Sequence, residues 1–214
     1  SVKKNFLSIR FGVGMVFQYP EYQLFAETVK EDVAYGIKNF FSSKSEAETE
    51  QMVKEAINMV GLCYDEIKDK SPFELSGGQK RRVAIAGVIV TQPEILVLDE
   101  PAAGLDPIGK REFIGILKKI HKTFAKTIII VSHDMDLIAE NCNKAAVFSD
   151  GEIIATGSPK EIFKDEKKVE AYGLELPITA FVTQELLKKN IDLNNDLTVA
   201  DFIRATQKFA EGEE

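Results

Sequence analysis

The stretch Glu94-Ile95-Leu96-Val97-Leu98-Asp99-Glu100-Pro101 decides the fold of this 214-residue chain. Four consecutive apolar residues bounded by polar ones are typical of a parallel strand that is buried on both faces. Open α/β sheets bind ligands beyond the carboxyl ends of such strands, and here that end carries two carboxylates. We therefore predict a ligand-binding edge at Asp99 and Glu100, against the alternative of an ordinary polar loop after a strand.

The flanking sequence extends this strand into an α/β pattern with a mostly parallel sheet. A second apolar run covers residues 128–131, and residues 108–124 between the runs have helical spacing. This arrangement predicts a βαβ unit with a right-handed crossover. The helix is expected to bury Phe113, Ile116, Leu117 and Ile120 on one face.

Other segments complete the predicted order of elements. Residues 13–17 suit a short buried strand, and residues 27–40, 46–60 and 77–89 suit helices. Ser45 and Glu48 have the spacing of a capping box, and Gly61 follows the second helix where a C′ glycine is common. Downstream we expect a β-hairpin over residues 145–156 with an Asp150-Gly151 turn, a charged helical stretch over 160–168, and two short helices over 178–189 and 198–209.

Composition excludes several classes of protein. The chain is 44% hydrophobic and 29% charged, as in an ordinary globular protein, and no apolar run approaches the roughly 18 residues of a membrane span. No apolar segment of a signal peptide follows Lys3 and Lys4. The net charge of −7 argues against nucleic acid as a partner. Two distant cysteines, Cys63 and Cys142, with only two histidines, predict free thiols and no Cys/His metal site.

A second candidate site is the helix entry Leu75-Ser76-Gly77-Gly78-Gln79. Ser76 is a good N-cap residue, and the glycines allow a ligand to approach the backbone closely. The free N–H groups and the positive end of the helix dipole favour an anion there. The alternative is a plain helix-entry turn without a ligand.

Two further polar residues are expected near the same sheet edge. Gln18 closes the first predicted strand, and its amide can touch both a metal and an attacking water. His133 follows the strand over 128–131 and can hydrogen-bond a phosphate oxygen, although a histidine at a strand end is often only a structural polar residue. At the first site, one carboxylate can hold Mg²⁺ and the other can orient water.

Together these residues resemble the nucleotide-binding subunit of an ABC transporter, with the similarity covering about residues 10–160. The resemblance implies a P-loop NTPase (RecA-like) core over 1–159, an inserted helical subdomain at about 27–90 and a helical C-terminal extension over 160–214. It also implies ATP and Mg²⁺ as cofactors. By this resemblance, Ser76, Gly77, Gly78 and Gln79 form the signature motif, and Asp106 in the D-loop communicates across a dimer. Asp99 is the metal ligand of the Walker B motif, and Glu100 is the catalytic glutamate. His133 is the switch histidine, and Gln18 is the Q-loop glutamine, which is catalytic and also contacts the metal.

A narrower resemblance concerns the ATPases of energy-coupling factor (ECF) importers of cobalt, nickel or vitamins. It is carried by residues 16–25, 28–29, 32–36 and 81–87, and the Pro20-Glu21-Tyr22-Gln23-Leu24-Phe25 form is closer to the A-prime type. The implied partners are a second ATPase subunit, identical or different, a transmembrane T-type subunit and a substrate-binding S subunit. The implied location is the cytoplasmic face of the membrane, without direct contact to the transported solute. The tail after Gly173 resembles an extension that pairs two ATPase subunits, with a small satellite core as the alternative.

The sequence lacks the P-loop pattern G-x-x-x-x-G-K-[ST] that this family requires before the Q-loop. It also lacks the upstream aromatic residue that stacks on adenine. Gly12-Val13-Gly14 is not a substitute, because no Lys-Ser/Thr follows it and it leads into a strand. We therefore expect the sequence to be part of a longer polypeptide, with N-terminal strands and P-loop missing, and to be inactive alone.

Two other functions stay open at this point. A non-catalytic ABC subunit can donate its signature motif to a partner's ATP. A soluble ABC ATPase of DNA repair or translation is less well supported, because residues 18–75 contain no heptad run and no cysteine cluster. Arg81 and Arg82 are expected at the surface of a helix, in contact with either a partner or solvent, and solvent is the commoner case for such arginines.

Overall fold

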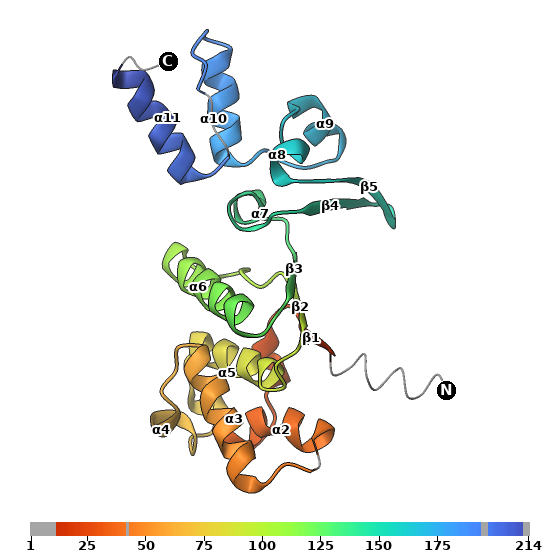
Figure 1. Ribbon diagram of the computed structural model, residues 1–214, viewed down its shortest axis with the longest axis vertical. Helices are drawn as coiled ribbons and strands as arrows, with labels where there is room; N and C mark the ends of the chain where they lie inside the picture. The colour runs from red at the N-terminus through yellow and green to blue at the C-terminus, as the bar shows by residue number, and fades with distance from the viewer. Residues whose placement is uncertain (1–11, 42, 194–196, 212–214) are drawn as a thin grey trace. The chain divides into compact units, whose positions relative to one another are not determined.

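The computed structural model describes residues 12–41, 43–193 and 197–211 (Figure 1). The chain divides into two compact units, Ser1–Val131 and Ser132–Glu214. Each unit contains a hydrophobic cluster of its own. The first unit holds the predicted sheet, and the second begins directly after its last strand. The functional boundary at 159/160 stays a prediction, since this division reflects compactness alone.

The first unit is built on a three-stranded parallel sheet. Its strands are β1 (Val13–Val16), β2 (Ile95–Asp99) and β3 (Thr127–Val131), in the spatial order β1-β2-β3. Val16 pairs with Leu98, and Asp99 pairs with Val131. The predicted parallel sheet and βαβ unit are therefore confirmed, and the strands end at one common edge.

Helices connect these strands. Between β1 and β2 lie the 3-10 helix η1 (Pro20–Gln23), α2 (Val29–Phe40), α3 (Glu46–Met59), α4 (Tyr64–Ile67), the 3-10 helix η2 (Pro72–Glu74) and α5 (Gly77–Ile89). The helix α6 (Pro107–Thr123) joins β2 to β3 and buries Phe113, Ile116, Leu117 and Ile120, as predicted from their spacing. Gly61 has a φ of 77° just after α3, in agreement with its predicted C′ role.

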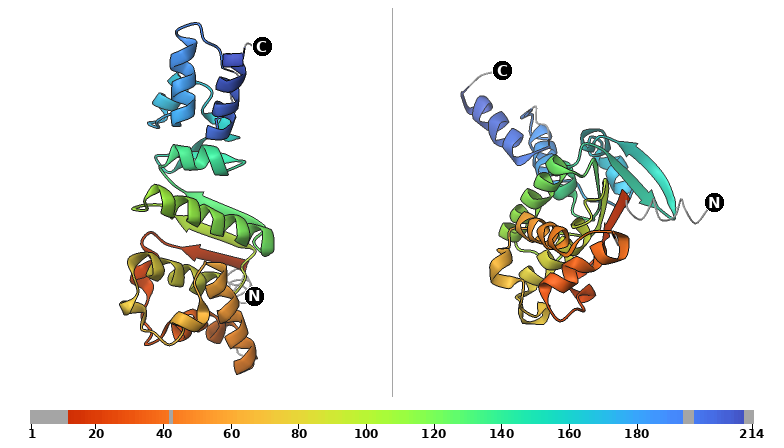
Figure 2. Two further views of the ribbon diagram at one scale, coloured as in Figure 1. Left: turned by 90° about the vertical axis from the view of Figure 1, so that its left-hand side faces the viewer. Right: turned by 60° about the horizontal axis from the view of Figure 1, so that its bottom comes forward.

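The prediction that the strands are buried on both faces is wrong for the described residues. Leu96 and Leu98 are fully buried on one face of the sheet, whereas Met15, Ile129 and Val131 on the other face are 44–53% exposed. Strands that follow one another in spatial order, joined by right-handed crossovers, receive all their connecting helices on the same side. Figure 2 shows α6 lying along one face of the strands.

The second unit begins with α7 (Met135–Asn141) and continues with a β-hairpin. The hairpin consists of β4 (Ala145–Ser149) and β5 (Glu152–Gly157), close to the predicted bounds. The charged stretch over 160–168 is not one helix but two, because Asp165 accepts hydrogen bonds from the backbone N–H groups of Lys167 and Lys168 and so starts a new one. The helices after the hairpin are α8 (Pro159–Ile162), α9 (Glu166–Ala171), α10 (Ile178–Leu187) and α11 (Val199–Glu211).

Asp32 fixes the start of α2 to the segment that precedes it. Only 9% of its surface is exposed, and its Oδ2 accepts hydrogen bonds from the backbone N–H groups of Phe25 (2.8 Å) and Ala26 (2.9 Å). Two amides therefore depend on one buried oxygen, and the chain between η1 and α2 is held in place by it.

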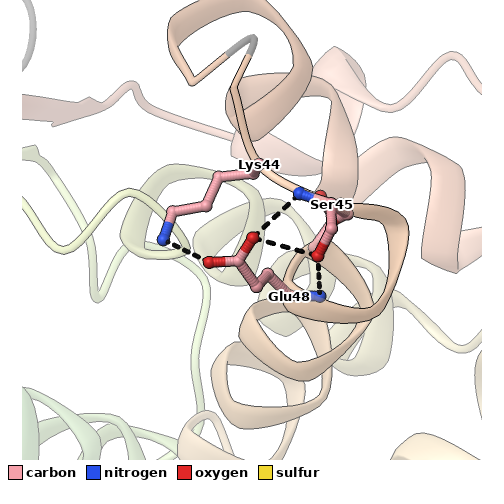
Figure 3. Close-up of polar contacts among 4 residues, drawn as sticks. Lys44, Ser45 and Glu48 are labelled. Atoms are coloured by element: carbon pink, nitrogen blue, oxygen red, sulfur yellow. Dashed lines mark hydrogen bonds and ion pairs between the residues drawn. The ribbon is translucent and has the colours of Figure 1, made fainter.

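The start of α3 is held by the predicted capping box (Figure 3). Ser45 Oγ accepts from the backbone N–H of Glu48, and Glu48 Oε2 accepts from the backbone N–H of Ser45 at 2.9 Å. Lys44 Nζ lies 3.0 Å from Glu48 Oε1. The Ser45 N–H and the charge of Lys44 lower the pKa of Glu48 from 4.5 to about 2.

We predict that Asp32→Ala destabilises the fold by about 1–3 kcal/mol, because it leaves two backbone amides without an acceptor. Urea unfolding followed by circular dichroism measures this change. Asp32→Asn is the matched control, since its carbonyl oxygen still accepts from both amides, and it should cost less. Equal losses in the two variants would contradict the assigned role of the Oδ2 acceptor.

We also predict an acid-dependent loss of stability from Glu48. A carboxyl whose pKa is lower in the folded state stabilises the fold above its unfolded pKa, and the stabilisation disappears as the pH falls toward the folded pKa. The contribution should therefore decline between pH 4.5 and about 2. Urea midpoints in this window should fall more steeply for the unmodified protein than for Glu48→Gln, and parallel curves would contradict the prediction.

Candidate active site

The parallel register brings three of the predicted site residues to one edge of the sheet. Asp99 is the last residue of β2, Glu100 follows it, and Gln18 lies two residues beyond Val16, the partner of Leu98. Asp99 and Glu100 are partly exposed, and Gln18 is exposed. Asp99 alternates with Leu98, so it belongs to the sheet face that the connecting helices do not cover. A ligand at this edge can reach all three side chains from solvent.

The backbone at Glu100 has an unusual conformation. Its φ is 45°, in the left-handed region that a residue with a Cβ seldom adopts. Its N–H donates to the carbonyl oxygen of Val131 at 2.9 Å, and its own carbonyl accepts from the N–H of Ala103 at 3.1 Å. Strained backbone persists where the surrounding structure fixes it, and such residues gather at functional sites.

The guanidinium of Arg81 fixes the same turn from the side of α5. It donates to the carbonyl oxygens of Pro101 (2.6 Å) and Ala103 (2.9 Å), and more weakly to that of Glu100 (3.4 Å). Arg81 is only 7% exposed, so the commoner of the two alternatives, contact with solvent, is wrong for this residue. Arg82 is half-buried and pairs with Glu112 of α6. The role of Arg81 is not visible in the sequence, because a helix-surface arginine and a buried one have the same spacing until the packing partner of the helix is known.

The signature segment forms the predicted helix start. Ser76 and Gln79 make a reciprocal capping box at the N-terminus of α5. The Gln79 N–H donates to Ser76 Oγ at 3.3 Å, and the Ser76 N–H donates to Gln79 Oε1 at 3.0 Å. Gly77 and Gly78 are exposed, and their amides donate to no other described residue. The anion-binding capacity of this helix start therefore rests on these two amides and the helix dipole.

The two remaining candidates have different positions. Asp106 is the N-cap of α6, and its Oδ1 accepts from the N–H of Gly109 at 2.6 Å. This contact gives Asp106 a structural role within the chain, and its predicted role across a dimer stays a prediction. His133 lies in the second unit, two residues after Val131, so its contribution to the site also stays a prediction.

Gly14, from the Gly12-Val13-Gly14 piece, serves packing. A Cβ at Gly14 would lie 2.7 Å from Pro93 Cγ and 2.9 Å from Val88 Cγ1, so only glycine lets β1 lie this close to the end of α5. This packing gives Gly14 a structural role, and the expectation that the piece does not replace a phosphate-binding loop stays a prediction.

The segment after Gln18 carries aromatic residues at the surface. Tyr19 and Tyr22 have ring centroids 6.1 Å apart, and Phe25 meets Tyr35 of α2 edge to face at 4.9 Å. All four are exposed, with Tyr22 at 84%. Patches of exposed aromatic residues mark surfaces that contact other proteins, so this segment combines a site residue with a candidate contact surface.

The residues present fit a magnesium–nucleotide complex better than a free metal. Asp99 offers a carboxylate and Gln18 an amide oxygen, which are the hard donors that Mg²⁺ prefers. No group of three or more His, Cys, Asp or Glu side chains converges anywhere in the described ranges. Mg²⁺ at protein sites is commonly held by one or two carboxylates together with substrate phosphates, and this donor set matches that pattern.

The chain resembles known proteins along most of its length. The family model described as "ABC transporter" matches residues 2–103. The energy-coupling factor transporter ATP-binding protein EcfA2 of Clostridium acetobutylicum is 48% identical over 197 residues, which cover 92% of this chain and 68% of that protein. The chain spans 65–68% of the length of three such proteins from Clostridium species.

Two solved structures share the fold. CbiO1 from Clostridium perfringens, described as part of the ABC transporter complex cbiONQ, matches with a TM-score of 0.68 and 39% identity, covering 85% of this chain and 70% of that one. A dimeric ATP-binding cassette in a post-hydrolysis state with ADP and Pi matches with a TM-score of 0.62 and 27% identity, covering 74% and 68%. The α/β fold of a P-loop NTPase is therefore confirmed. The chain belongs to the family of ABC-type ATP-binding proteins of energy-coupling factor transporters.

Proposed function

We propose that this chain is the ATP-binding and ATP-hydrolysing part of an ECF-type importer subunit. The observation that carries the proposal is that Gln18, Asp99 and Glu100 lie at the carboxyl edge of one parallel sheet, in the same unit as an exposed helix start of the signature type. The names of the relatives support it, because they are ATP-binding proteins of such transporters. The transported solute is proposed as a metal ion, cobalt or nickel, or a vitamin.

In this mechanism each residue has one task. Glu100 orients the attacking water and draws its proton toward the carboxylate, while Asp99 and Gln18 provide oxygen ligands for the magnesium of the ATP complex. Mg²⁺, held by Asp99 and Gln18 together with the phosphates, would neutralise charge that develops on the phosphates. His133 donates a hydrogen bond to the terminal phosphate.

The signature residues act toward a second subunit in this proposal. The amides of Gly77 and Gly78 bind the phosphates of a nucleotide that the partner ATPase holds, and Asp106 contacts that partner. The dimeric ATP-binding cassette with ADP and Pi is a structural relative that assembles in pairs. The exposed helix start and the family membership together support this arrangement.

The surfaces of each unit support proposals for further partners. The aromatic segment around Tyr22 is proposed to contact the transmembrane T-type subunit, which acts with a substrate-binding S subunit, and α2 and α3 transmit the motion. The helix α11 has no buried residue and exposes Val199, Ile203 and Phe209, which suits pairing with a second ATPase subunit. In the described ranges, no helix has the length and hydropathy of a membrane span. We propose a peripheral position at the cytoplasmic face, without contact to the solute.

A non-catalytic role is the second candidate function. The printed sequence contains no G-x-x-x-x-G-K-[ST] pattern, so a subunit that only donates its signature motif to a partner's ATP is consistent with it. A soluble ABC ATPase acting on nucleic acid has less support, because the chain is acidic and its relatives are transporter proteins. Salt-dependent binding to DNA or RNA would favour that function instead.

We predict that Glu100→Gln lowers the ATP hydrolysis rate of the assembled complex by more than about 100-fold, because the amide cannot accept the proton of the attacking water. Binding of Mg²⁺-ATP should be retained, and the closed dimer should accumulate. Phosphate release and size-exclusion chromatography measure the two effects.

Glu94→Gln is the matched control for this experiment. Glu94 precedes the same strand, is exposed, and pairs with Lys126, so its removal should leave hydrolysis unchanged. Unaltered hydrolysis in Glu100→Gln would contradict the catalytic proposal and favour the non-catalytic role.

A further inference from the structure

We infer that Arg81 is a positioning residue that couples the segment after Gln18 to the turn carrying Glu100. The inference rests on the proposed function, because it assigns Arg81 a role in ATP hydrolysis through Glu100. It concerns a side chain that neither ligates a metal nor belongs to the five signature positions. The guanidinium of Arg81 contacts the turn after β2 on one side and faces the segment after Gln18 on the other.

On the first side, Arg81 holds the backbone of the turn after β2. Its two terminal nitrogens reach three carbonyl oxygens, those of Glu100, Pro101 and Ala103, at 2.6 to 3.4 Å. A planar guanidinium can present several N–H groups in fixed directions, whereas an ammonium cannot span the same set. The contact therefore fixes the path of the chain at the residue whose φ is 45°.

On the second side, Arg81 faces the segment after Gln18. The helix η1 packs against α5, and the charge of Glu21 acts on the Arg81 guanidinium. Among the described residues, two buried side-chain atoms have no hydrogen-bond partner, and they are Oε2 of Glu21 and Nε of Arg81. These two atoms belong to buried groups of opposite charge that do not hydrogen-bond to each other, so Glu21 attracts the guanidinium through its charge while the terminal nitrogens bind the turn.

These two sides make Arg81 a mechanical link. When η1 moves, the attraction that the Glu21 charge exerts on the guanidinium changes, and the terminal nitrogens of this rigid group pass the change to the turn. The backbone beside Gln18 is also under constraint, since Tyr19 has a φ of 54°. A small shift of the aromatic surface segment is thereby transmitted to the carboxylate at the end of β2. Misplacement of a reacting group by about 1 Å can lower a rate by a factor of about 100.

The first experiment uses Arg81→Lys in the full-length subunit within its assembled complex. This variant keeps the positive charge but loses the planar set of N–H donors that binds the three carbonyl oxygens, so kcat for ATP hydrolysis should fall by about 10- to 100-fold. KM for ATP should stay within about twofold, because no nucleotide contact is removed. Arg82→Lys is the matched control, since Arg82 is the neighbouring arginine and pairs with Glu112 instead of the turn. It should keep the kcat of the unmodified protein.

The double variant Arg81→Lys/Glu100→Gln separates positioning from general damage. If Arg81 acts through Glu100, the double variant should be no slower than Glu100→Gln alone. With Glu100→Gln inactive as expected, three results would overturn the inference. They are additive losses of kcat in the double variant, a rise of KM in place of a fall of kcat in Arg81→Lys, and an unchanged kcat in Arg81→Lys. An unchanged rate in Glu100→Gln itself would overturn the proposed function and the inference together.

Glu21→Gln tests the second side and does not disturb the turn. Its kcat should fall by about three- to tenfold, and the loss should vanish in the Arg81→Lys background. An unchanged kcat in Glu21→Gln would overturn the coupling to the segment after Gln18. If Arg81→Lys does not yield folded protein, Glu21→Gln is compared with the double variant Glu21→Gln/Glu100→Gln. The losses of kcat from the two substitutions should again not add, and additive losses would overturn the inference.

Discussion

The burial of the Arg81 guanidinium is the constraint on which the site depends. A buried charge is costly unless its hydrogen bonds are satisfied, and here the acceptors are backbone carbonyls of one turn. The turn must therefore point its carbonyls toward α5, and Glu100 takes a left-handed backbone conformation in doing so. The Arg81 side chain thus fixes the position of α5, which carries the signature motif, relative to the turn that follows β2 and its carboxylates.

The order of the strands adds a second constraint, on where a ligand can bind. Because β1, β2 and β3 succeed one another in space, right-handed connections place their helices on one face. Leu96 and Leu98 are buried by that layer, while Asp99 falls on the opposite face by the alternation of the strand. The hydrophobic core and the polar site therefore use alternate residues of the same five-residue strand, so the packing of β2 fixes the direction of its carboxylate.

Much of this could be predicted from local patterns in the sequence. The apolar run of β2, the stripe on α6, the capping box at Ser45 and the N-cap at Ser76 depend on neighbours within a few positions, so their outcome follows from spacing. Arg81 could not be predicted in this way. Ile85 stands four residues after Arg81 and three after Arg82, so helical spacing places both arginines beside the apolar stripe. The difference arises from a turn 20 residues later in the chain, where the packing of α5 brings carbonyl acceptors to one arginine and Glu112 to the other.

The capping contacts also explain how one residue can serve both folding and function. Asp106 uses Oδ1 to cap α6, yet a carboxylate offers about four acceptor sites, so capacity remains for a donor of a partner chain. Ser76 Oγ accepts from the Gln79 N–H, and its own hydroxyl hydrogen can still be donated to a phosphate. In both residues the local hydrogen bond fixes the side-chain position before a partner arrives. Such preorganisation lowers the entropy that is lost on binding, so the structural role of these residues strengthens the proposed functional one.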